Sequence, residues 1–129
     1  MKITRVLCIE DSIPKYMDVQ SFLKKQNVKA IDWARNSEKA LELLEKNCMG
    51  EEEYDLIISD MHFEFEGEND LHAGEKLLNL LREKGCDIPI VFCSSQNWKI
   101  EGAAGSIFYN ENRDWQSEAE EIFRNLRKL

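Results

Sequence analysis

The sequence reads DLIISDM at residues 55–61, a short apolar run that ends on a carboxylate. An apolar run without polar alternation is typical of a strand buried on both faces of a parallel sheet. Residues 6–11 read VLCIED and repeat the pattern, with Glu10 and Asp11 at the end of the run. We therefore expect two buried strands whose carboxyl ends both carry acidic side chains.

Further strands and helices alternate along the rest of the chain. Residues 30–34, 88–94 and 106–109 are the other expected strands. Helical periodicity predicts one helix between Ser12 and about residue 26, a second after residue 36 or 37, a third over 73–84, and a fourth from Trp115 to about residue 126. This alternation predicts an α/β fold: a flavodoxin-like, doubly wound sheet of five parallel strands in the order 2-1-3-4-5.

The first expected helix has four candidates for the inward face. These are Ile13, Tyr16, Met17 and Leu23.

Length and composition limit the classes of function. The 129 residues fit a single domain, which we expect to span residues 1–129, and 33% of them are charged, with a net charge of −8. An acidic chain is a poor direct partner for nucleic acid or for an anionic membrane surface. No apolar run approaches the roughly 20 residues that span a bilayer. The four cysteines form no metal-binding or redox pair, so we expect buried thiols and a cytoplasmic location.

The acidic strand ends define a candidate site. In a doubly wound sheet, ligands bind outside the carboxyl ends of the strands, where the strand order reverses between the first and third strands. Glu10, Asp11 and Asp60 should meet there, with Ser94 at the end of the fourth strand beside them. Clustered carboxylates need a raised pKa or a cation, and oxygen ligands of this kind suit Mg²⁺. A carboxylate beside Mg²⁺ is also a competent nucleophile for phosphoryl transfer.

These motifs give the chain a resemblance to the receiver domains of two-component response regulators, over essentially its whole length. The matching segments are LCIED (7–11), DLIISDM (55–61), the glycine of AGEKLL (73–78), PIVFCSS (89–95) and GAAG (102–105). The resemblance implies that Asp60 accepts a phosphoryl group and that Ser94 hydrogen-bonds to it. It also implies that Asp11, Asp60 and the backbone carbonyl of His62 bind Mg²⁺, with Glu10 acting through water.

Three departures from the family pattern bear on function. Tyr109 stands where the family has a lysine, which would deprive the phosphoryl group of a fixed positive charge unless another lysine, such as Lys99, reaches the pocket. Asp60 and Gly74 are 14 positions apart, so an acidic loop is inserted over the site. Ser94 and Gly105 are only 11 positions apart, so helix 4 of the family should be missing or reduced. Trp98, in this shortened segment, is interpreted as a packing residue.

The leading hypothesis is a signalling switch phosphorylated on Asp60 by a sensor histidine kinase or a phosphotransfer protein, with an unknown downstream protein target. The alternative is a pseudo-receiver, an interaction module of the same fold that no longer switches by phosphorylation. A phosphohydrolase of the haloacid-dehalogenase type needs a second aspartate two positions after the nucleophile, where His62 stands. Enzymatic activity would be limited to phosphorylation and dephosphorylation of Asp60 itself.

Overall fold

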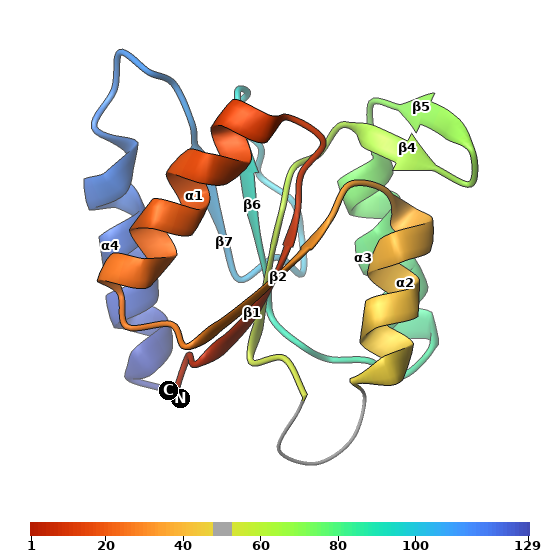
Figure 1. Cartoon of the computed structure of the whole chain (residues 1–129), viewed down its shortest axis with the longest axis horizontal. Helices are drawn as coiled ribbons and strands as arrows, with labels where there is room; N and C mark the ends of the chain where they lie inside the picture. Colours follow the sequence, from red (N-terminus) through yellow and green to blue (C-terminus); the bar gives the residue numbers. More distant parts are fainter. Residues whose placement is uncertain (48–52) are drawn as a thin grey trace.

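The computed structural model describes residues 1–47 and 53–129, which form a central sheet flanked by helices (Figure 1). The sheet strands are β1 (Arg5–Ile9), β2 (Ala30–Ala34), β3 (Leu56–Ser59), β6 (Ile90–Ser94) and β7 (Gly105–Phe108). All neighbouring pairs are parallel, in the order β2-β1-β3-β6-β7. This is the predicted order 2-1-3-4-5 once the strands of the sheet are counted alone. The fold class is thereby confirmed. Each strand of the sheet begins and ends within two residues of its expected position.

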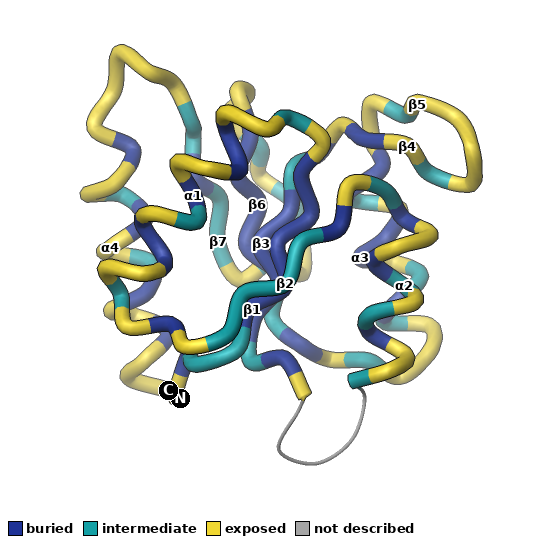
Figure 2. The backbone as a smooth tube through the Cα atoms, viewed as in Figure 1, coloured by how far each residue is buried: buried dark blue, intermediate teal, exposed yellow. Residues whose placement is uncertain are grey.

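Helices cover both faces of the sheet. They are α1 (Ile13–Lys25), α2 (Ser37–Lys46), α3 (Ala73–Glu83) and α4 (Trp115–Arg127). Figure 1 shows α1 and α4 on one face, with α2 and α3 on the other. The inner strands are buried along their length (Figure 2), and their alternate residues contribute to two separate hydrophobic clusters, one under each pair of helices. Continuous apolar runs are the expected composition of such strands.

The inward face of α1 differs from the prediction at two positions. Tyr16 and Leu23 are buried, but Ile13 and Met17 are 52% and 55% exposed. The buried positions follow a single helical stripe that also includes Val19 and Phe22. Ile13 and Met17, four residues apart, share a different face of the helix, so the predicted set combined two faces.

The acidic insert after Asp60 forms a β-hairpin rather than the expected loop. Its strands are β4 (Phe63–Phe65) and β5 (Glu68–Asp70), which pair antiparallel. The two-residue turn has positive φ at both Glu66 (54°) and Gly67 (88°), as a type I′ hairpin turn requires. Phe63 is fully buried in the cluster under α2 and α3, so the hairpin is anchored to the domain.

The segment between β6 and β7 contains no helix. Residues 95–104 are all described, and they form bends and one turn instead. The prediction that helix 4 is missing or reduced is confirmed. Gly102 adopts a φ of 88° in this segment, a conformation that glycine reaches without steric cost.

Three of the four cysteines lie in the described part of the chain. Cys8 and Cys93 are free and buried, and Cys86 is free and partly buried. Cys48 lies outside the described residues. Of the helices in the described ranges, none is both long and apolar enough to cross a membrane.

The buried anchor of the hairpin leads to a test. Phe63→Ala should lower the free energy of unfolding by about 3–5 kcal/mol, because it leaves a cavity in a packed cluster. Glu64→Ala, at the exposed neighbouring position, should change it by less than about 0.5 kcal/mol. Urea denaturation measures both values. Equal effects of the two substitutions would show that the hairpin is not anchored through Phe63.

Candidate functional site

Three carboxylates meet at the carboxyl edge of the sheet. Glu10 and Asp11 follow β1 and Asp60 follows β3, while Ile9 and Ser59 are opposite each other in the parallel pair. One carboxylate oxygen from each of the three residues lies within 4.8 Å of the others. The strand register thus brings together the acidic residues selected from the sequence, and their chemical roles stay predictions.

Glu10 is almost completely buried. It is 3% exposed; its Oε2 accepts a hydrogen bond from the backbone N–H of Ser12 at 3.1 Å, and its Oε1 lies 2.9 Å from the Lys15 ammonium. Burial raises the pKa of Glu10 to about 7, with Lys15 opposing the rise and Asp60 adding to it. Both oxygens of Glu10 therefore have protein partners.

Asp60 is held on one side and open on the other. Its Oδ1 accepts a hydrogen bond from the Met61 N–H at 2.7 Å and lies 3.3 Å from the Lys15 ammonium. Within the described part of the chain, no hydrogen bond reaches its Oδ2. A Cβ atom at Gly74 would lie 2.6 Å from the Asp60 carbonyl oxygen, so the start of α3 approaches this residue more closely than any side chain permits.

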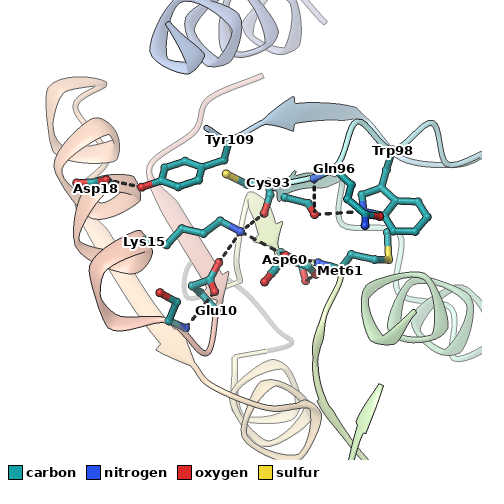
Figure 3. Close-up of polar contacts among 12 residues, drawn as sticks. Glu10, Lys15, Asp18, Asp60, Met61, Cys93, Gln96, Trp98 and Tyr109 are labelled. Carbon is teal, nitrogen blue, oxygen red and sulfur yellow. Dashed lines mark hydrogen bonds and ion pairs between the residues drawn. The ribbon is translucent and has the colours of Figure 1, made fainter. Parts of the chain in front are cut away.

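The cation in this pocket comes from α1. Figure 3 shows Lys15 reaching from the first turn of α1 between Glu10 and Asp60. Its Nζ also donates to the Cys93 carbonyl at 2.6 Å, so three oxygens match the three N–H groups of an ammonium. Burial by itself would lower the pKa of Lys15. The combined effect of Cys93, Asp60 and Glu10 outweighs burial, so the pKa of Lys15 lies above its ordinary value.

The expectation that the pocket lacks a fixed positive charge is therefore wrong. Lys15 supplies the ammonium, and Lys99, the lysine suggested from the sequence, is exposed. Sequence reasoning missed Lys15 because a lysine in the first turn of a helix is usually solvated. The available signal was its spacing: Lys15 lies four and seven positions before the buried Val19 and Phe22, on the apolar stripe of the helix.

Tyr109 stands where the receiver resemblance implies a lysine, and its contacts differ from those expected of a lysine there. Its hydroxyl donates a hydrogen bond to the Asp18 carboxylate of α1, and its ring centroid lies 5.5 Å from the Lys15 Nζ. Burial and the Asp18 contact raise the pKa of Tyr109 above its ordinary value, so the phenol is neutral at pH 7. Tyr109 thus connects the end of β7 to α1 without adding charge to the pocket.

A pocket of about 310 Å³ adjoins Asp60 and is lined by Ser94, Trp98, His62 and His72 among others. Figure 3 shows Trp98 on the opposite side of Asp60 from Lys15. Ser94 is buried, and its Oγ accepts hydrogen bonds from the Trp98 indole N–H at 3.2 Å and from the Gln96 N–H at 3.3 Å. Trp98 also meets His72 edge-on, with ring centroids 5.5 Å apart. Trp98 packs as predicted, and its bond to Ser94 was missed.

The donor set fits a single Mg²⁺ ion. Two oxygens bound directly to one Mg²⁺ are at most about 4.2 Å apart, so a spread of up to 4.8 Å suits two direct carboxylate ligands and one acting through water. Glu10, whose oxygens have other partners, suits the indirect position. With all groups ionised, three carboxylates and Lys15 carry a net charge of −2, which a divalent cation balances. His62 is exposed and lines the adjoining pocket; binding through its carbonyl stays a prediction.

No protein-family model matches this sequence, and comparison with curated proteins finds no match. The similarity is to solved structures. The response regulator protein TrrA of Thermotoga maritima, in a complex with Mg²⁺-BeF, superposes with a TM-score of 0.71 at 23% identity, covering 95% of this chain and 98% of that chain. A signal receiver domain of an HD domain-containing protein from Pseudomonas fluorescens gives 0.73 at 17%, with 98% and 96% covered.

The chemotaxis response regulator CheY4 of Vibrio cholerae gives a TM-score of 0.64 at 18% identity, with 98% of each chain covered. At these identities the similarity establishes the fold. The chain has the receiver-domain fold of response regulators.

Proposed function

We propose that this chain is a phosphoryl-accepting switch of a two-component phosphorelay, in which Asp60 is the acceptor and Mg²⁺ the cofactor. The observation that carries the proposal is the position of Asp60: its Oδ2 accepts no hydrogen bond from the described residues, while its Oδ1 is fixed by the Met61 N–H and the Lys15 ammonium. Glu10 and Asp11 lie beside it. A carboxylate held in this way is oriented as a nucleophile.

The proposed step transfers one phosphoryl group. An Asp60 oxygen forms a bond to the phosphorus of a phosphorylated imidazole, the P–N bond breaks, and its electron pair returns to the imidazole nitrogen, which takes a proton from water. Bound Mg²⁺ would neutralise charge on the phosphoryl oxygens. Asp11, Asp60 and the His62 carbonyl would hold the ion, and Glu10 would orient a bound water.

Ser94 would contact the phosphoryl group from the side opposite Lys15. It lines the same pocket as Asp60, and its hydroxyl can donate to a phosphoryl oxygen. The proposed donors are a sensor histidine kinase or a phosphotransfer protein, and the target is a downstream protein. Free thiols at Cys8, Cys86 and Cys93 favour a reducing location such as the cytoplasm.

The decisive experiment is chemical phosphorylation. Acetyl phosphate with Mg²⁺ should add the mass of one phosphoryl group to the intact protein, and Asp60→Asn should abolish the addition because the acceptor oxygen is lost. Asp87→Asn, at an exposed position before β6, is the matched control and should be modified as the wild type is. Mass spectrometry of the intact chain measures the outcome.

A chain that neither gains a phosphoryl group nor binds beryllofluoride would instead be a pseudo-receiver. The observation that favours this second candidate is the absence of a helix in residues 95–104, after β6.

Magnesium should stabilise the native fold. An ion that binds only the folded chain adds RT ln(1 + [L]/Kd), about 2.7 kcal/mol at one hundred times Kd. The melting temperature measured by differential scanning calorimetry should therefore rise with millimolar MgCl₂, and NaCl at equal ionic strength is the control. Asp11→Asn, an exposed change that leaves the core intact, should remove most of the shift. A melting temperature that does not respond to MgCl₂ would contradict the assignment of Mg²⁺.

Trp98 should report occupancy of the site. If the Ser94 side chain rotates to donate to a phosphoryl oxygen, its Oγ moves away from the Trp98 indole N–H that donates to it, and the ring enters a new environment. Beryllofluoride with Mg²⁺ should then change the tryptophan emission of the wild type but not that of Trp98→Phe, which retains Trp33 and Trp115. Ser94→Ala should abolish the change. A response of equal size in Trp98→Phe would place the reporter elsewhere.

A further inference from the structure

We propose that Lys15, on α1, is the residue that binds the phosphoryl group on Asp60, so that the phosphorylated state is coupled to the first helix of the domain. This rests on the proposed function of Asp60. The Lys15 side chain is only 11% exposed, and its ammonium forms ion pairs with both Glu10 and Asp60. It is the ammonium that contacts the Asp60 carboxylate among the described residues.

The contacts of Lys15 divide into one neutral and two charged partners. The Cys93 carbonyl at the end of β6 accepts from Nζ at 2.6 Å and keeps the same charge in both states. Glu10 and Asp60 compete for the remaining N–H groups. A phosphoryl group on Asp60 brings more negative charge within reach of Nζ than the carboxylate does, so the ammonium should transfer a contact from a carboxylate to a phosphoryl oxygen.

The burial of Lys15 and Asp60 strengthens this contact. Nζ lies between Glu10, itself 3% exposed, and the buried ends of β1 and β6. An ion pair shielded from water in this way is much stronger than one on the surface. A preorganised ammonium also costs little reorganisation during transfer, because its Cys93 partner already fixes its position.

The location of Lys15 also sets the direction of coupling. Lys15 lies in the first turn of α1, and one turn later Asp18 accepts the hydrogen bond of Tyr109. A shift of Nζ toward a phosphoryl oxygen therefore acts on the first two turns of α1 and, through Asp18, on the end of β7. The structure thus provides a route to β7 that does not need a lysine on that strand.

The test measures beryllofluoride affinity in the presence of Mg²⁺ by isothermal titration calorimetry. Lys15→Met keeps the aliphatic stem and removes the charge, and should weaken binding by about tenfold to a hundredfold, as expected for loss of a charged hydrogen bond. Lys24→Met is the matched control, because Lys24 is exposed on the same helix, and should bind as the wild type does. Adding Tyr109→Lys to Lys15→Met restores an ammonium from β7 and should recover much of the affinity.

A second measurement needs no substitution. The side-chain ammonium resonance of Lys15, followed by ¹⁵N NMR in the full chain, should shift when beryllofluoride binds, and the largest amide shifts in α1 should fall on residues 13–19. Unchanged affinity in Lys15→Met, or an unshifted Lys15 resonance while beryllofluoride is bound, would overturn the inference and leave the role of Asp60 standing. A wild-type chain that does not bind beryllofluoride at all would overturn both proposals.

Discussion

The ion pairs of Lys15 with Glu10 and Asp60 make the carboxyl edge of the sheet possible. The pairing of β1 with β3 places three carboxylates within 4.8 Å of one another, and two of them are largely removed from water. Like charges so close, without a cation, would force protonation or unfold the edge. One ammonium contacts two carboxylates and a carbonyl, yet leaves the cluster negative. The pocket is therefore stable enough to form and still has unbalanced charge for a divalent ion.

Local pattern was sufficient to predict the framework. Buried parallel strands have unbroken apolar runs, and the edge where their carboxyl ends meet follows from topology alone, so Glu10, Asp11 and Asp60 could be grouped from the sequence. Lys15 could not be found in that way, because its role depends on which face of α1 packs on the sheet. The hairpin was missed because strands of three residues carry almost no periodic signal, although Glu66-Gly67 matches a two-residue turn.

A site of this kind needs a positive charge at a position in space, whichever element provides it. Lys15, in the first turn of α1, reaches Asp60 through its four-carbon stem (Figure 3), and the Tyr109 ring at the end of β7 lies 5.5 Å from the Lys15 ammonium. Once Lys15 occupies the pocket, a second ammonium from position 109 would add repulsion. Tyr109 fits better: its ring packs 5.3 Å from Trp115 and its hydroxyl reaches Asp18. The positive charge that the receiver resemblance implies at position 109 is thus supplied here from α1.

Two contacts can transmit a change at Asp60, and they differ in what they must move. Lys15 belongs to α1, whose inner face is packed into the hydrophobic cluster with α4, so a pull on Nζ meets a well-packed helix. Trp98 belongs to residues 95–104, which lack the backbone hydrogen bonds of a helix and hold the Ser94 hydroxyl through the Gln96 N–H and the Trp98 indole N–H. Segments with few buried contacts open at lower free energy than packed helices. If Asp60 is phosphorylated as proposed, the larger displacement should therefore fall in the Trp98 segment, and the response of α1 should be confined to its first turns and their contact with Tyr109.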